Sequence, residues 1–414
     1  QSLARLVRDH PERPETASRL LSSLRHLSTA LPVDHPASRQ PVGAACVDPS
    51  GTHLFTLDPD GAGRLWDLET GRIQWGPRDL GLKTRHAVYG PKGRHIALRK
   101  DSEVIVIDAT SGELVGERLQ HEGKLHGVWF SRDGQRLVSG TVAGTARLWR
   151  PGDTNAEALT LSPGGWVQWG EFSPDGSQVV TCSRVYSDSK AQRWDVETGE
   201  LLLTIDDFED VVQCARFSGD GRTLFTASND QTIRFYDPAT GEETKERIQH
   251  PRDFAFFRAH PSPDATRLLT VSIDEHSARI WDIATGKPVG EPMIHEDRVY
   301  FATWNSDGTR ILTSSWDQTA RVWDGTTGEP VTGPLRHHTS LTQVGFVPHG
   351  DTVFTTDHSG SKFGLCVAVH LFQGLEHTTE KWDPSNLARS IFAHYMQSSA
   401  PVLLIEGSNT VPGQ

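Results

Sequence analysis

The side chains of this 414-residue chain that could do chemistry are its 19 histidines, 53 acidic residues and four cysteines. Zinc sites and disulfide frameworks need cysteines at close, paired spacing. The four cysteines instead lie far apart, at Cys46, Cys182, Cys214 and Cys366. His337 and His338 are the only adjacent histidines, and two neighbours without a third ligand make a poor metal site. We therefore expect no metal and no disulfide, and a reducing, cytoplasmic location.

Catalytic motifs are also missing from the sequence. It contains no nucleophile elbow, no phosphate-cradling glycine loop and no Cys–His pairing. Segments of the "SPDG" and "DxxTG" kind recur along the chain, and such turns use Asp to bind nearby backbone amides and Gly to accept a positive φ. A catalytic pair of carboxylates would occur once, so we assign the recurring ones to structure. The sequence predicts a protein without catalytic residues or cofactors.

Composition limits the classes of partner. The net charge of −12 counts against nucleic-acid binding, which needs a cationic surface. No stretch approaches 18 uninterrupted apolar residues, so no segment is expected to span a membrane. The 38 glycines, 24 prolines and 12 tryptophans indicate a soluble, turn-rich protein built from β-strands.

The turns form an internal repeat. Eight turns, seven of them ending in glycine, each follow an apolar strand and begin at residues 47, 89, 130, 172, 217, 261, 304 and 346, so the interval is always 41 to 45 residues. A second apolar strand follows each of the first seven turns at a fixed distance, usually ending in Trp-Asp as in "ARVWD" at 320–324. Unrelated loops would not keep such a period, which is typical of repeat architectures.

Each unit reads as four short antiparallel strands, from alternation between turn residues. In the seventh unit we predict strands at "VYFATW" (299–304), "RILTSS" (310–315), "ARVWD" (320–324) and "EPVTGPL" (329–335). Four such strands cannot bury both faces of their sheet alone. Stacking the sheets in a ring solves this, because each sheet covers its neighbour.

On these repeats the chain resembles the WD-repeat family, whose four-stranded β-propeller blades recur every 40–45 residues. The resemblance covers roughly residues 31–372. It implies an all-β propeller of eight four-stranded blades; seven blades with the last unit appended is the alternative. It also implies an Asp–His–Ser–Trp network within each blade, here His250, Ser272, Asp274 and Trp281 in the sixth, and His295, Ser315, Asp317 and Trp323 in the seventh.

Other blades lack part of this network. Ala143 stands at the aspartate position of the third blade, while Ile107 and Tyr236 replace the tryptophan in the second and fifth. We expect apolar packing to hold these blades. The histidines at repeat-equivalent positions before the inner strands are then structural and lie too far apart to share one ion: His121, His250, His295 and His337.

The ends of the chain need separate treatment. The eighth unit has "KFGLCVAVHLF" (362–372) as its third strand and no fourth, whereas 30–40 matches the style of a fourth strand. We expect 30–40 to close the ring of blades 41–372. Residues 1–29 read as helix and resemble the linker that joins bacterial WD-repeat arrays to upstream modules, often a serine/threonine kinase domain. Because the chain begins with Gln1, an upstream part is expected; the tail 373–414 stays unassigned.

In the resembling family, partners commonly bind the ring face that carries the loop before each inner strand and the turn between the second and third strands. Here that face would present Lys100, Lys124, Trp166, Arg184, Asn229, Arg298 and Trp316. Trp316 is predicted to be an exposed anchor, because interface hot spots favour Trp and Arg; packing on a neighbouring loop is the alternative. The acidic run 206–210 is either a solvated loop or a patch that docks a basic segment.

We therefore predict a monomeric, non-catalytic platform for a protein or peptide partner, a module of a larger signalling protein. The rival hypothesis is an enzyme or small-ligand binder that uses the central channel. Small apolar residues lining the channel would favour the platform, and converging charged groups would favour the rival. The inner strands, with Ala, Val, Gly and Trp, predict the former.

Overall fold

The computed structural model of the chain describes residues 30–32, 42–68, 70–84, 86–153, 157–185, 188–250, 256–272, 275–337, 339, 341–347, 352–357, 365–367 and 369–371. Residues 31–370 form one compact unit, and nearly all described residues belong to it. Residues 1–30 and 371–414 make up the other unit. The predicted helix over 1–29 and the tail 373–414 lie outside the described residues.

The described residues form seven four-stranded sheets and one three-stranded sheet, which we number as blades one to eight, and a separate two-stranded sheet. Blade one contains β2 (Ala44–Val47), β3 (His53–Leu57), β4 (Ala62–Asp67) and β5 (Ile73–Asp79), and blade two contains β6 (Ala87–Tyr89), β7 (His95–Lys100), β8 (Glu103–Asp108) and β9 (Leu119–Gln120). Blade three contains β10 (Leu125–Phe130), β11 (Leu137–Thr141), β12 (Ala146–Trp149) and β13 (Leu159–Leu161), and blade four contains β14 (Trp166–Phe172), β15 (Gln178–Val185), β16 (Asp188–Asp195) and β17 (Leu201–Ile205).

Blade five contains β18 (Val212–Phe217), β19 (Leu224–Ser228), β20 (Thr232–Tyr236) and β21 (Ile248–Gln249), and blade six contains β22 (Phe256–Pro261), β23 (Arg267–Ser272), β24 (Ser277–Asp282) and β25 (Pro288–Ile294). Blade seven contains β26 (Val299–Trp304), β27 (Arg310–Ser315), β28 (Thr319–Asp324) and β29 (Leu335–Arg336), and blade eight contains β30 (Leu341–Val347), β31 (Thr352–Asp357) and β32 (Leu365–Val367).

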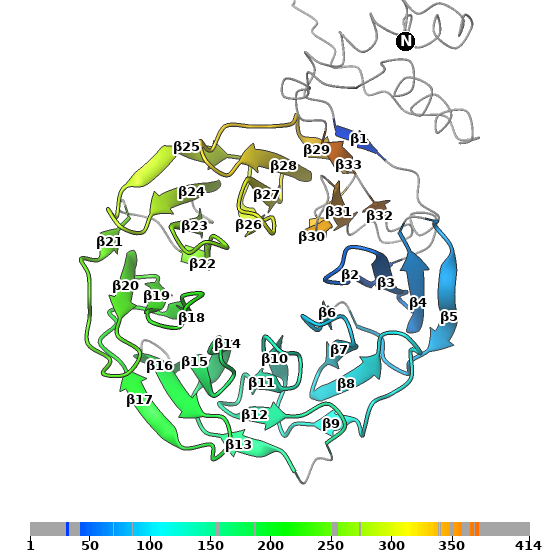
Figure 1. The fold of residues 1–414 in the computed structure, drawn as a ribbon, viewed down its shortest axis with the longest axis horizontal. Coiled ribbons are helices and arrows are strands. Elements are labelled where there is room, and N and C mark those ends of the chain that lie inside the picture. Colours follow the sequence, from blue (N-terminus) through cyan, green and yellow to red (C-terminus); the bar gives the residue numbers. More distant parts are fainter. Residues whose placement is uncertain are drawn as a thin grey trace, which may run out of the picture. The chain divides into compact units, whose positions relative to one another are not determined.

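The blades stand in a ring, with the first strand of each sheet nearest the centre (Figure 1). β30 contacts both β26 and β2, so the eighth blade closes the ring between the seventh and the first. The prediction of an all-β propeller of four-stranded sheets is confirmed. The eighth blade is shorter than predicted within the described residues, with three strands.

Strand boundaries in the seventh blade test the sequence pattern closely. β26 and β27 have the predicted bounds, and β28 begins one residue earlier. The predicted fourth strand over 329–335 is wrong: β29 covers only Leu335–Arg336, and Pro330 forms a single isolated bridge to Trp323. Blades two and five, which have no proline in this segment, show the same arrangement of one isolated bridge and a two-residue fourth strand.

The ends of the ring also differ from the prediction. The single strand expected over 362–372 is two short strands, β32 and β33 (Val369–Leu371). β33 pairs with β1 (Ala30–Pro32) in a two-stranded sheet of its own. Most of the predicted closing strand over 30–40 lies outside the described residues, so its place in the eighth blade stays a prediction.

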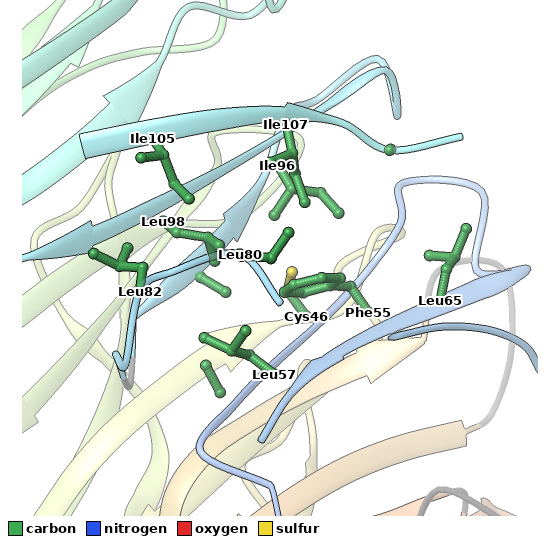
Figure 2. Packing of buried hydrophobic residues seen from close by; sticks show 13 residues of the cluster. Cys46, Phe55, Leu57, Leu65, Leu80, Leu82, Ile96, Leu98, Ile105 and Ile107 are labelled. Atoms are coloured by element: carbon green, nitrogen blue, oxygen red, sulfur yellow. The ribbon is translucent and has the colours of Figure 1, made fainter. Parts of the chain in front are cut away.

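Apolar side chains fill the space between neighbouring blades, because each sheet is covered on both faces. Between blades one and two, Phe55 and Leu57 face Ile96 and Ile105, with Leu80 beside them (Figure 2). All five are buried. Burying one such side chain contributes about 1.5–3 kcal/mol, so these contacts are a main source of stability for the ring.

The turns after the inner strands behave as the sequence predicts. In blade four, Asp175 accepts hydrogen bonds from the Ser173 hydroxyl at 2.5 Å and the Ser177 amide at 3.1 Å, and Gly176 has φ +73°. Blade six places Ala265 at the equivalent point with φ +57°, a conformation that costs an L-residue free energy. These carboxylates therefore hold turns together and face no reaction centre.

Candidate docking face and central channel

The seventh blade contains a buried hydrogen-bonded network. The His295 ring lies between Asp317, 2.9 Å from Nδ1 to Oδ2, and Thr313, 2.7 Å from Nε2 to Oγ1. The Trp323 indole donates to the same Thr313 hydroxyl at 2.8 Å. Burial alone would raise the pKa of Asp317, but the hydrogen bonds from His295 and Thr319 hold it well below its usual range. The network therefore joins the loop before β26 to β27, to β28 and to the turn between them.

The serine predicted for this network, Ser315, is wrong. The hydroxyl comes from Thr313, which lies two residues earlier in the same strand. Ser315 does not bridge the two rings; its hydroxyl donates to the Asp297 carbonyl at 2.8 Å and accepts from the Asp317 amide at 3.0 Å. Trp323 pairs in register with Ile311, so Thr313 lies two residues from this pair, whereas Ser315 lies four residues from it. The Thr313 hydroxyl therefore reaches the indole. The family resemblance placed the hydroxyl at the end of β27. The His295 and Trp323 side chains instead meet at a hydroxyl two residues earlier in that strand.

The sixth blade shows the same displacement. The Trp281 indole donates to Thr270 at 3.0 Å, while the hydroxyl of Ser272 accepts from the Glu275 amide at 3.1 Å. The His250 ring lies 4.2 Å from the Trp281 ring, between centroids. Asp274, the fourth expected member, lies outside the described residues. Thr270 thus takes the place assigned to Ser272.

The third blade has the network without its aspartate. His121 Nε2 lies 2.6 Å from the hydroxyl of Ser139, which accepts from the Trp149 indole at 2.7 Å. His121 Nδ1 is buried and has no hydrogen-bond partner within the part of the chain that the structure describes. Ala143 occupies the position that Asp317 has in blade seven, which explains the missing acceptor. Burial, aided by Arg147, lowers the pKa of His121 to about 4.

The fifth blade uses an ion-pair cluster that the sequence analysis missed. Arg234 is 1% exposed and pairs with Asp230 at 2.8 Å and Asp207 at 2.9 Å. Its guanidinium lies over the Phe208 ring, 5.1 Å from Cζ to the centroid, and Tyr236 donates to Asp207 at 3.3 Å. A buried cation needs such partners. The acidic run 206–210 provided the only sequence signal, because it supplies Asp207.

The predicted docking face is one of the two faces of the ring. Antiparallel register sets the start of each inner strand opposite the end of the second strand, as in Val299↔Ser315 and Trp166↔Arg184. The loop before the inner strand and the turn after the second strand therefore adjoin in the blades where both are described. The seven predicted residues lie at or next to such positions. Four are exposed, namely Lys100, Lys124, Arg298 and Trp316, and three are half-buried, namely Trp166, Arg184 and Asn229.

Four of these residues form two Arg–Trp pairs. The Arg298 guanidinium lies over the Trp316 ring, 5.4 Å from Cζ to the centroid, and the Trp316 amide donates to the Arg298 carbonyl at 2.9 Å. Trp316 is 46% exposed, as an anchor residue should be. The Arg184 guanidinium lies 4.4 Å from the Trp166 ring centre. Asn229 instead accepts from the side chain of Gln213 at 3.1 Å.

Both tryptophans of these pairs line one cavity, the central channel, of about 1630 Å³. Residues of the expected types, Ala, Val, Gly and Trp, form part of the lining, with Ala87, Val128 and Gly170 among them. Large aromatic and charged side chains also contribute to it, mainly from the inner strands. They include Tyr89, Trp129, Trp169, Tyr300, Phe301, Arg99, Glu171 and Arg216.

The charged residues at the middle of the channel neutralise one another. Arg216 donates to Glu171 at 2.7 Å, lies 2.9 Å from His260 Nδ1, and has its guanidinium 4.9 Å from the Trp169 ring centre. The Trp129 ring lies next to the Trp169 ring, with the two centroids 5.9 Å apart. The Arg216–Glu171 pair is therefore satisfied within the protein.

A Ser–His–Asp group elsewhere on the ring does not form a nucleophile. Ser50, His53 and Asp48 line a pocket of about 550 Å³. The hydroxyl of Ser50 donates to Asp48, and Asp48 also accepts from the backbone amides of Thr52 and His53, at 2.8 and 2.7 Å. Nucleophilic catalysis would need the hydroxyl on the histidine. This group is a first-blade version of the turn.

Two other properties concern only the described residues. Among them no group of three or more His, Cys, Asp or Glu side chains could hold a metal ion. No helix in that part of the chain is long and apolar enough to cross a membrane.

Comparison with known proteins agrees with this fold. The family model "WD domain, G-beta repeat" matches residues 112–150, 199–237 and 286–324. Each segment ends at the Trp-Asp position or its equivalent in blades three, five and seven. These three segments are therefore similar to WD repeats.

Curated relatives are similar over parts of their length. The chain is 28% identical over 198 residues to eukaryotic translation initiation factor 3 subunit I of Coccidioides immitis, covering 44% of this chain and 58% of that protein. It is 29% identical over 245 residues to WD repeat-containing protein 1 of Mus musculus, covering 53% and 38%. The matched part thus spans about two fifths to three fifths of these relatives.

A solved structure shows the same fold. The crystal structure of the computationally designed Ika8 protein superposes with a TM-score of 0.65, at 19% identity, over 83% of this chain and 100% of the designed one. This likeness concerns the fold alone.

Proposed function

We propose that the protein is a non-catalytic docking platform whose channel-rim face binds a polypeptide partner. By channel-rim face we mean Trp166 and Arg184 of blade four and Arg298 and Trp316 of blade seven. The observation that carries the proposal is Trp316, a large aromatic side chain 46% exposed at the rim of the channel and covered on one side by Arg298. Interface hot spots are enriched in such residues.

The relatives support this proposal. Translation initiation factor 3 subunit I is, by its name, a component of a larger assembly. A propeller contributes to an assembly by offering a rigid face, and the buried network of blade seven fixes the turn that carries Trp316. We further propose, from the resemblance, a cytoplasmic monomer that is one module of a larger signalling protein of bacterial type.

The basic character expected of the partner loses its main support. Within the acidic run 206–210, Asp207 forms ion pairs with Arg234 and Arg247, and the Asp210 carbonyl accepts from Ser228 at 3.1 Å. These contacts serve blade five. A basic segment elsewhere on the partner stays a prediction that rests on the remaining exposed carboxylates.

The test is capture of partners from the source cell by the intact chain. The triple variant Trp166→Ala, Arg298→Ala and Trp316→Ala should lose the partners that wild type recovers, with an unchanged circular dichroism spectrum. A matched control is Ile73→Ala, Leu201→Ala and Arg222→Ala, which removes exposed apolar and cationic side chains at other places on the ring. Equal recovery by wild type and the rim variant would contradict the proposal.

Small-ligand binding in the channel is the second candidate, favoured by its aromatic lining. The volume of about 1630 Å³ exceeds that of ordinary small-molecule pockets, about 300–1000 Å³, so a peptide side chain or segment suits it better. A metabolite that raises the melting temperature of wild type, but less that of Trp169→Ala, would support the small ligand instead.

A further inference from the structure

Two arginines at the channel rim form no ion pair with any carboxylate of the described residues. Arg99, one residue before the end of β7, donates from Nη1 to the Leu125 carbonyl at 3.2 Å and lines the channel. Arg184 stacks on Trp166 and, with the side-chain amide of Gln168 in its favourable orientation, donates from Nε to Gln168 at 3.1 Å. Both guanidinium groups keep donors that these neutral partners do not use.

An aromatic floor connects the two arginines. Leu125 adjoins His126, whose ring meets the Trp166 ring edge-on, with centroids 5.3 Å apart and planes at 78°. His126 and Trp166 both line the channel. We name Arg99, His126, Trp166 and Arg184 the arginine strip; it runs across the inner edges of blades two, three and four.

Two other arginines, one in the channel and one in blade five, have carboxylate partners. Arg216 is paired with Glu171, and Arg234 with Asp207 and Asp230. Arg99 is partly buried without such a partner, and burial lowers its pKa, against a smaller opposing effect of Tyr300. Arginine nevertheless stays charged at neutral pH. An anion placed here would recover the free energy that desolvation of an unpaired cation costs.

We propose that the arginine strip binds an acidic segment of the partner polypeptide, with an Asp or Glu carboxylate on Arg99 and an apolar side chain of the same segment against Trp166. This inference rests on the proposed function and names the chemistry of the partner. Charge complementarity selects the occupant, because the unmatched groups are guanidiniums and these bind carboxylates in a planar, bidentate way. The net charge of −12 disfavours a nucleic acid, which carries its phosphates over a much longer track.

The experiment selects peptides from a displayed random library on the intact wild-type chain. We expect enrichment of Asp and Glu in the selected peptides. A fluorescently labelled synthetic copy of the strongest one should bind the double variant Arg99→Gln, Arg184→Gln at least about tenfold more weakly by anisotropy, since charge-assisted hydrogen bonds are the strong ones. The control is Arg72→Gln, Arg222→Gln, which removes two exposed arginines outside the lining of the channel and should leave the affinity unchanged.

A second peptide makes the test specific. Replacing its Asp and Glu by Asn and Gln should weaken binding to wild type and cause no further loss on the Arg99→Gln, Arg184→Gln variant. Independent, additive losses would overturn the assignment of the carboxylate to these arginines. So would a labelled oligouridine that binds wild type more tightly than the peptide and loses affinity in the same variant.

The outcome also separates this inference from the proposed function. Peptides that lose binding on Trp316→Ala but show no enrichment in acidic residues would leave the docking platform standing and overturn the acidic segment. Selected peptides whose binding is indifferent to both the arginine strip and Trp316 would overturn both.

Discussion

At the scale of single residues, equivalence between blades explains most of the polar interior. His121, His295 and His337 each meet a hydroxyl two residues before the end of the second strand, as Ser139, Thr313 and Thr355. The histidine positions were predictable, because the repeat fixes their distance from the turn. The hydroxyl partner was not, since serine and threonine occur at both neighbouring inward positions and only the indole geometry decides between them.

His121 provides a residue-scale prediction. Its folded pKa of about 4 lies below the ordinary value of 6.5, so the folded state binds fewer protons than the unfolded chain between these values. Its contribution to stability is complete above pH 6.5 and falls as the pH drops from 6.5 to 4. Ala143→Asp gives Nδ1 the acceptor that blade seven has, which should raise this pKa and reduce the loss.

The measurement is urea unfolding at pH 7 and pH 5. Ala143→Asp should raise the free energy of unfolding by about 0.5–1.5 kcal/mol at pH 7, the net worth of one hydrogen bond, with a larger gain at pH 5. Ala143→Asn is the matched control, because its amide oxygen accepts without a charge and should give no extra gain at pH 5. A lower stability for Ala143→Asp at both pH values would contradict the equivalence of Ala143 and Asp317.

At the scale of elements, the sequence predicts the inner three strands of a blade better than the fourth. β26, β27 and β28 follow from alternation between turn residues, since each has a buried face that must keep its register. β29 is as short as β9 and β21, and in all three blades a single isolated bridge precedes the short strand. The lining of the channel could not be predicted from the type of fold, because the residues that face the axis are set by register and bulges, such as the one between Val299 and Phe301.

The seventh blade separates structural from exposed tryptophan. Trp323 is 5% exposed and bonded to Thr313, so Trp323→Ala should lower the free energy of unfolding by about 3–5 kcal/mol. Trp316→Ala should cost less than about 1 kcal/mol, because the ring already faces solvent. Denaturant unfolding of both variants gives the comparison, and similar losses would refute the division of roles.

At the scale of the whole molecule, the ring turns a repeated blade into a unique surface. The blades share turns and core positions, yet they differ at the rim, where Arg–Trp pairs occur in blades four and seven. Repetition made the fold predictable from the sequence. It could not reveal which rim residues meet, because blades distant in the sequence come together only around the channel.

The central claim, docking at the channel-rim face, is tested most directly by hydrogen–deuterium exchange of the intact chain with and without its captured partner. The account predicts slower exchange at the backbone amides of 124–127, 166–168 and 298–300, where the inner strands begin. The outer strands β5, β17 and β25 should be unchanged. Protection confined to those outer strands, or to the turns at the other ends of the inner strands such as 173–177, would contradict the claim.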